Sequence, residues 1–373
     1  MRDPWPPQLT FEVGAALVRV ARTWRVEHRP ERMRWSWGEG VLGLGLLAAG
    51  RASGDPDCAR FVRAWLGHHQ ARGVTMAWSD HVTPAWPALE LVLAGDDGLR
   101  PIVDRAAAYL AAAPRTAGGL VDHFGARRGS PLVRIAAQLV PAPFADAWID
   151  SLFHVAPTLC RLAAATGRSS FRDDAAAQAA GFGRALQDPA TGLFAHAYRD
   201  ADDERVPSWE RGEPWARGNG WALAALVDVI LQLPGGPVRD ELADRARRLA
   251  DAVIAVQDRG GLFHTVLTDP STYVETAGSA LLVYGLGRGA RAGLLDERAR
   301  AAAIRGMGGL LGAVVHVRGG GAHVVGTSVA TVPLPGFYRF VPRRRQVTYG
   351  VGAWLLAAAE MCAPVAEADS SAC

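Results

Sequence analysis

The chain has 373 residues, and 49% of them are hydrophobic, which is enough to bury a large core. Its 40 basic and 37 acidic residues nearly cancel, and no basic stripe indicates a nucleic-acid partner. The first residues lack the apolar region of a signal peptide, and no stretch is long enough to span a membrane, so we expect a cytoplasmic protein. The four cysteines show no metal-binding or disulfide spacing, which fits a reducing compartment.

Apolar residues recur at helical spacing along nearly the whole chain, with Ala-rich stretches and few β-branched runs. We therefore expect an all-α protein. The twelve predicted helices span residues 9–27, 38–50, 57–71, 83–94, 99–113, 148–166, 171–187, 218–233, 238–258, 274–292, 296–314 and 348–363.

The connections between these helices alternate in length. Short loops such as 51–56, 95–98 and 234–237 follow the even-numbered helices, whereas the long loops, 114–147, 188–217 and 315–347, lead into them. Six helical hairpins of this kind close naturally into a ring, so we predict one (α/α)6 barrel domain over residues 1–373. A linear solenoid of helix pairs is the rival architecture. The polar tail from about residue 364 is predicted to be disordered.

The even-numbered helices share a feature at their starts, where aromatic or polar residues stand beside small ones. These starts include Trp37, Ser79-Asp80-His81, Trp148 with Asp150, Glu275-Thr276 and Tyr349. If these helices form the inner ring, their N-termini surround one mouth of the barrel, where the helix dipoles favour an anionic ligand. Residues 215–221, Trp-Ala-Arg-Gly-Asn-Gly-Trp, combine aromatic faces, a guanidinium and glycines, as a sugar-binding wall requires. A buried tryptophan pair between two helices is the alternative.

Residues 215–221, together with 148–157 (Trp-Ile-Asp-Ser-Leu-Phe-His-Val-Ala-Pro) and 275–280 (Glu-Thr-Ala-Gly-Ser-Ala), resemble the unsaturated rhamnogalacturonyl and glucuronyl hydrolases of glycoside hydrolase families 105 and 88. The ending at 349–360 is similar to the last inner helix of these enzymes. The resemblance implies an (α/α)6 barrel that removes a 4,5-unsaturated uronic acid from the non-reducing end of oligosaccharides left by a polysaccharide lyase. It implies hydration of the double bond, with protonation at C4 and addition of water at C5. It also implies that neither a metal nor a cofactor is needed.

The resemblance extends to single residues. Asp150 matches the general acid and base, whose pKa must be raised toward the working pH, which burial against Trp148 and Phe153 could supply. Asp80 resembles a second carboxylate, His196 a histidine near the sugar, and His123 a partly matching histidine before the catalytic helix. Trp215, Arg217 and Trp221 would contact the unsaturated ring, and Trp37 is a further substrate-binding candidate. The chain departs from the family at His154, where an apolar residue is common.

Other interpretations stay open at this point. Asp150 and Asp80 could simply be carboxylates at helix N-termini, and the arginines at 343–345 could grip a uronate or form a solvated cluster. The same barrel supports sugar epimerases that use two histidines, for which His264, His316 and His323 are available. A barrel that binds sugars without turnover is a third function. The type of uronide and the oligomeric state are left open.

Overall fold

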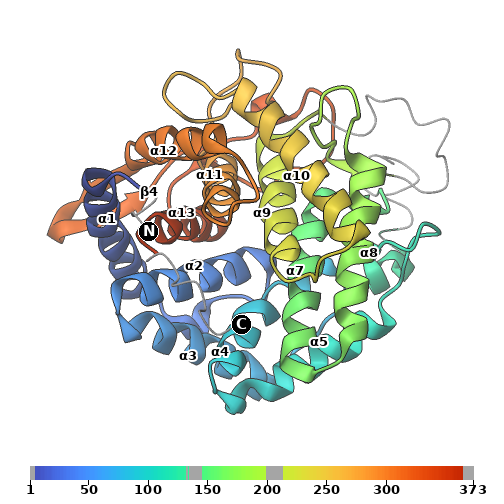
Figure 1. Cartoon of the computed structure of the whole chain (residues 1–373). Coiled ribbons are helices and arrows are strands. Elements are labelled where there is room, and N and C mark those ends of the chain that lie inside the picture. The colour runs from blue at the N-terminus through green and yellow to red at the C-terminus, as the bar shows by residue number, and fades with distance from the viewer. Residues whose placement is uncertain (1–4, 132, 134–144, 199–212, 364–373) are drawn as a thin grey trace, which may run out of the picture.

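The computed structural model describes residues 5–131, 133, 145–198 and 213–363. Its helices form two concentric rings (Figure 1). The inner ring comprises α2 (Trp37–Ser53), α4 (Ala85–Leu93), α7 (Ile149–Thr166), α9 (Ala216–Ile230), α11 (Thr276–Arg291) and α13 (Thr348–Cys362). The outer ring comprises α1 (Pro7–Glu27), α3 (Pro56–Arg72), α5 (Arg100–Ala112), α8 (Ser169–Leu186), α10 (Pro237–Ala255) and α12 (Glu297–Leu311).

The first and last inner helices, α2 and α13, pack against each other and close the ring, and every other inner helix contacts its neighbours around the barrel. A linear solenoid is thereby excluded, and the predicted (α/α)6 barrel is confirmed. All twelve predicted helices are present among the described residues, mostly within a few residues of their expected bounds. The predicted disordered tail lies outside the described residues.

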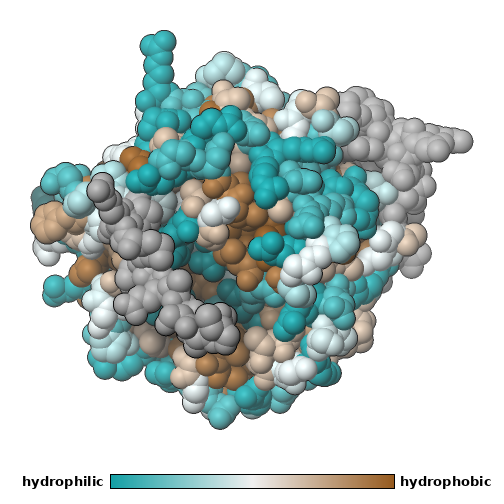
Figure 2. Space-filling model, in the orientation of Figure 1, coloured by the Kyte–Doolittle hydropathy of each residue, from teal (hydrophilic) through white to brown (hydrophobic). Residues whose placement is uncertain are grey.

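The two rings differ in how their helices are buried. Every residue of α9 and nearly every residue of α13 is buried, because an inner helix has protein on all sides. Outer helices such as α10 bury only an apolar stripe and expose charged residues. Figure 2 shows the result on one face of the molecule, where hydrophobic residues gather near the middle within a hydrophilic rim. No helix in the described ranges is long and apolar enough to cross a membrane.

Three short antiparallel strand pairs, which the sequence did not predict, lie in the long loops. They join β1 (Ala147–Trp148) to β2 (Ala197–Tyr198), β3 (Val314–Val317) to β4 (Gly321–Val324), and β5 (Thr327–Ser328) to β6 (Arg343–Arg344). The 3-10 helix η2 (Ser79–His81) lies between α3 and α4, and the 3-10 helix η9 (Tyr338–Phe340) lies between α12 and α13. Strands of two to four residues are too short to show an alternating pattern of hydrophobicity.

Glycines allow the inner helices to approach one another closely. A Cβ atom at Gly352 of α13 would lie 2.4 Å from the carbonyl oxygen of Val41, and one at Gly45 of α2 would lie 2.4 Å from the carbonyl oxygen of Gly352. A Cβ atom at Gly278 of α11 would lie 2.7 Å from the backbone nitrogen of Arg217. Because the obstructing atoms are backbone, a side chain at these positions would force neighbouring helices apart.

This packing predicts opposite effects for two Gly→Ala substitutions. Gly352→Ala should destabilise the protein by about 1–3 kcal/mol, because it overpacks the contact between α2 and α13. Gly67→Ala is the matched control: nothing lies within 4 Å of a Cβ atom there, so its better helix propensity should stabilise α3 by about 0.5–1 kcal/mol. Thermal unfolding of both variants measures the effects, and shifts of the same sign would contradict this account of ring closure.

Candidate active site

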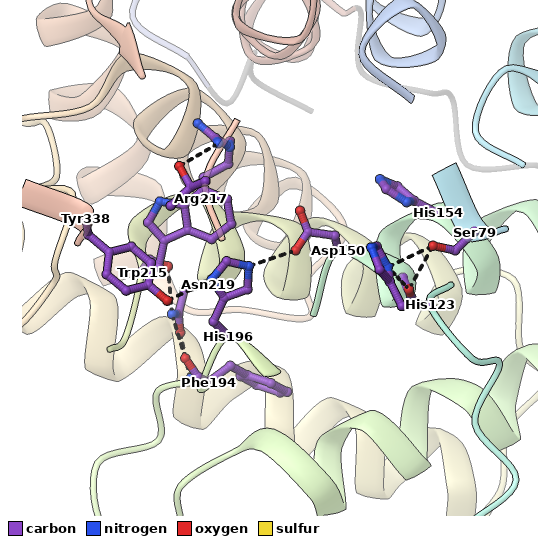
Figure 3. Close-up of polar contacts among 12 residues, drawn as sticks. Ser79, His123, Asp150, His154, Phe194, His196, Trp215, Arg217, Asn219 and Tyr338 are labelled. Carbon is purple, nitrogen blue, oxygen red and sulfur yellow. Dashed lines mark hydrogen bonds and ion pairs between the residues drawn. The ribbon is translucent and has the colours of Figure 1, made fainter. Parts of the chain in front are cut away.

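Asp150 lies in the first turn of α7 and faces His196, whose Nε2 atom is 3.4 Å from Asp150 Oδ2 (Figure 3). The two residues are brought together by the β1–β2 pair, in which Trp148 is opposite Ala197. The backbone nitrogen of Ile149 also donates a hydrogen bond to the carbonyl of His196 at 2.9 Å. The short sheet therefore fixes the start of α7 against the segment that carries the histidine.

Asn219 holds the other side of the His196 segment. Its amide donates to the carbonyls of Phe194 and Trp215, both at 3.0 Å, and its Oδ1 accepts from the backbone nitrogen of Phe194 at 2.8 Å (Figure 3). His196 Nδ1 is hydrogen-bonded to the hydroxyl of Tyr338 at 2.8 Å. The asparagine of the Trp-Ala-Arg-Gly-Asn-Gly-Trp stretch thus positions a loop, and His196 connects Tyr338 to Asp150.

Asp80 lies on η2, directly before α4, and is 6% exposed. The residue before it, Ser79, contacts His123: the backbone nitrogen of Ser79 donates to the His123 carbonyl at 3.1 Å, and its hydroxyl lies 2.9 Å from His123 Nδ1. Ser151 on α7 makes a second 2.9 Å contact with the same ring nitrogen. His123 thereby ties η2 to the start of α7, and with them the two aspartates.

Aromatic rings surround these polar groups. Trp148 stacks on His123 with ring centroids 4.4 Å apart, and Trp215 stacks on His196 at 4.5 Å. Trp37 stacks on Tyr349 at 4.4 Å and meets the edge of Trp221 at 6.2 Å. The starts of α2, α7, α9 and α13 therefore meet at one end of the barrel, as predicted. Trp215 and Trp221 are both fully buried, in separate hydrophobic clusters, so each has a structural role in packing.

Arg217 is 1% exposed, and its guanidinium contacts other groups of the protein. Its Nη1 and Nη2 atoms donate to the carbonyls and hydroxyls of residues 328–331, with distances between 2.7 and 3.2 Å. Its guanidinium lies over the rings of Trp215 and Tyr349 and 3.6 Å from Glu275. Glu275 caps α11 and accepts from the backbone of Ser328 at 2.9 Å. Arg217 and Glu275 therefore anchor the β5 loop at the site, and direct contact of Arg217 with a sugar stays a prediction.

The two aspartates have opposite pKa shifts. Burial and the negative charge of Asp150 raise the pKa of Asp80 well above its ordinary value. Burial also acts to raise the pKa of Asp150, but the contact with His196, together with His154 and His123, outweighs it and lowers that pKa to about 2. The expectation of a raised pKa at Asp150 is therefore wrong for the ligand-free protein. The two shifts therefore favour the proton on Asp80 and the negative charge on Asp150.

A cavity of about 660 Å³ lies at the opposite end of the barrel, toward the C-termini of the inner helices. Its carboxylates are all neutralised: Arg161 pairs with Glu90 at 3.0 Å, Arg288 with Asp228 at 2.6 Å, and Arg291 with Glu360 at 2.5 Å. Cations at helix C-termini also stabilise the helix dipoles. Each of the carboxylates that line this cavity therefore has an arginine partner.

The remaining candidates from the sequence lie elsewhere. The arginines at 343–345 are exposed, which fits a solvated cluster. His316 and His323 sit on the β3–β4 hairpin, where they contact Arg19 and Glu27 of α1. Sequence reasoning missed Tyr338, and it gave Ser79 and Ser151 no role of their own although both lie in stretches that it singled out. In the part of the chain that the structure describes, no group of three or more His, Cys, Asp or Glu residues is arranged to hold a metal ion.

A helical barrel with two buried carboxylates among stacked aromatic rings defines a class, that of enzymes which bind sugars and transfer protons with acidic groups. Within that class, the chain belongs to Glycosyl Hydrolase Family 88, whose family model matches residues 12–364. It is a glycoside hydrolase.

The relatives of the chain agree with this family. The unsaturated rhamnogalacturonyl hydrolase YesR of Bacillus subtilis is 26% identical over 284 residues, which cover 73% of this chain and 76% of YesR. A family 105 glycoside hydrolase from C. acetobutylicum has the same fold, with a TM-score of 0.79 and 20% identity over 94% of this chain and 98% of that one. The unsaturated glucuronyl hydrolase of Bacillus sp. GL1 aligns with a TM-score of 0.66 and 20% identity, covering 88% of this chain and 86% of its own.

The raised pKa of Asp80 predicts that Asp80→Asn stabilises the protein at neutral and alkaline pH. Because the folded pKa lies above the unfolded one, the contribution of Asp80 to stability is present at low pH and is lost as pH rises through the folded pKa. The amide does not titrate, so its advantage should grow from about pH 4 upward and raise Tm by at least about 2 °C at pH 8. Melting curves from pH 4 to 9 measure this.

Asp104→Asn, at an exposed site on α5, is the matched control and should change Tm by less than about 1 °C. An Asp80→Asn variant that is less stable than the native protein at pH 8 would show that the carboxyl group is held by favourable contacts rather than strained by burial.

Proposed function

We propose that the chain removes a 4,5-unsaturated uronic acid from the non-reducing end of oligosaccharides produced by a polysaccharide lyase. The observation that carries the proposal is the pair of buried aspartates at one mouth of the barrel, with Asp150 beside His196 among stacked aromatic rings and with the pKa of Asp80 raised and that of Asp150 lowered. Membership of family 88 and the similarity to enzymes named unsaturated rhamnogalacturonyl and glucuronyl hydrolases support the same substrate class.

The proposed reaction is hydration of the enol-ether double bond. The π electrons of C4=C5 take up a proton at C4, and a water oxygen bonds to C5 while a carboxylate accepts the proton that this water loses. The product carries a hydroxyl group and the ring oxygen on C5, which is a hemiketal. Its ring opens to a C5 ketone and leaves a hemiacetal at C1, which releases the next sugar. The protein must therefore supply one acid and one base, and their proton count is restored at the end.

Asp150 is the group we propose to exchange protons with the substrate and the water. It lies at the start of α7 and faces His196, which orients it. Asp80 holds a proton more readily than Asp150, because burial and the negative charge of Asp150 both raise its pKa. The ligand's own carboxylate adds a further negative charge, which favours protonation of the pair and raises the pKa of Asp150 toward that of an acid catalyst.

The groups around the pair suit an anionic sugar. Trp37 is a partly buried aromatic ring at this end, and the side-chain N–H groups of Trp148, Trp215 and Trp221 are buried donors without an acceptor among the described residues. The N-termini of the inner helices add their positive dipole ends. A ligand rich in hydrogen-bond acceptors, such as a uronate, complements such an excess of donors.

An absorbance assay tests the proposal. Unsaturated uronides absorb in the ultraviolet through their conjugated double bond, so turnover of lyase-generated disaccharides should bleach that absorbance. Asp150→Asn should slow bleaching by at least about 100-fold, since it removes acid–base catalysis, while the melting curve and ligand binding persist. Asp104→Asn, on the outer helix α5, should leave the rate unchanged. The panel needs both galacturonyl- and glucuronyl-type substrates, because relatives with both names exist.

Other results of the absorbance assay would support the alternative functions. Binding without bleaching by the native protein would favour a sugar-binding barrel. A change in sugar configuration with intact absorbance would favour an epimerase, although His316 and His323 contact α1 rather than Asp150. Undiminished bleaching by Asp150→Asn would remove Asp150 from its proposed role.

A further inference from the structure

His154 is a buried histidine that the contacts described so far leave without a partner. It follows Asp150 by four residues on α7, so the two side chains lie on the same face of the helix. Its exposed fraction is 1%, yet neither ring nitrogen makes a hydrogen bond to any residue that the structure describes. A buried polar group without a partner destabilises a fold, and a plain apolar side chain would avoid that cost.

The surroundings of His154 place it inside the site. Its Nδ1 atom lies 3.6 Å from Asp80 Oδ1, which is beyond a hydrogen bond but within reach of a small adjustment. The ring of Trp37 lies roughly parallel to the imidazole at 6.1 Å, and Trp221 presents its edge at 6.3 Å. Figure 3 shows His154 in the same part of the site as Asp150, Ser79 and His123.

The chemistry of the two neighbours fixes how His154 can bond. Burial lowers the pKa of His154 to about 4, so the ring is neutral at physiological pH and has one donor and one acceptor nitrogen. Burial and the charge of Asp150 raise the pKa of Asp80 and so favour its protonated form, whose O–H can donate to Nδ1, the ring nitrogen that faces it. The hydrogen of the ring is then on Nε2, and that N–H needs an acceptor which the described residues do not provide.

We propose that His154 is a specificity-determining residue, whose Nε2–H donates a hydrogen bond to an oxygen of the bound uronyl ring while Nδ1 accepts one from Asp80. This inference rests on the proposed function, because it takes the uronide as the ligand. The oxygen belongs either to the carboxylate or to a hydroxyl of the ring. Both are acceptors, and both complete the same pair of hydrogen bonds.

The test compares affinity and stability in a background that binds but does not react. In Asp150→Asn protein, His154→Met should weaken binding of an unsaturated uronyl disaccharide by about 5- to 50-fold in calorimetric titration, because one buried hydrogen bond to the ligand is lost. The same substitution should raise Tm, since it replaces an unpartnered polar ring by an apolar side chain of similar size. A merely structural histidine would lower affinity and Tm together.

Two further variants sharpen the result. His154→Gln retains an N–H donor at a similar reach to Nε2 and should recover most of the affinity lost by His154→Met. His316→Met, at an exposed position of β3, is the matched control and should change neither quantity. Titration with the carboxyl-reduced disaccharide identifies the oxygen: an unchanged penalty indicates a hydroxyl, and a vanished penalty indicates the carboxylate.

Some results overturn the inference. Equal affinity of the native and His154→Met sites, or a fall in Tm together with affinity, would show that His154 does not select the ligand. If the native protein bleaches unsaturated uronides, these results defeat the role of His154 alone. If the native protein neither bleaches nor binds any of them, the proposed function fails and this inference fails with it.

Discussion

The close approach of the inner helices is the constraint on which the site depends. Glycines let the backbones of α2 and α13 touch, and Gly278 lets α11 approach the start of α9. Since each inner helix begins at the same end of the barrel, this close packing brings their first turns together and crowds Trp37, Tyr349, Asp80 and Asp150 into one region. Wider packing would expose these groups to solvent. The two aspartates would then have ordinary pKa values.

The two ends of the barrel differ in how their charged groups are paired. At the C-terminal ends of the inner helices, arginines form ion pairs with the carboxylates and also stabilise the helix dipoles. The charges at that end are therefore balanced. At the N-terminal end, the pKa of Asp150 is lowered, that of Asp80 is raised, and several buried donors have no acceptor among the described residues. Such an imbalance lowers stability and is compensated when a ligand of matching charge and hydrogen-bonding capacity enters.

Much of this arrangement could be predicted from the sequence. The helical period, the alternation of short and long loops and the motifs at the starts of the even helices specify the ring, and they place Asp150, His196 and the tryptophans at one mouth. What could not be predicted depends on distant segments meeting. The role of Arg217 as an anchor became visible only when residues 328–331 were found against it, and the pKa order of the aspartates depends on which histidines lie nearby. His154 stood out in the sequence as a departure, but its lack of a partner is a property of packing.

The hydrogen bond between Tyr338 and His196 has a consequence for the protons of the site. Burial raises the pKa of Tyr338 well above its ordinary value, so this phenol is a hydrogen-bond donor at any physiological pH. Donation from this phenol to Nδ1 requires the imidazole tautomer in which Nδ1 is bare and Nε2 carries the hydrogen toward Asp150. The segment around η9 thus contacts Asp150 indirectly, through His196. Substitutions in this segment can therefore change the pKa of Asp150 without replacing an acidic or basic residue of the site.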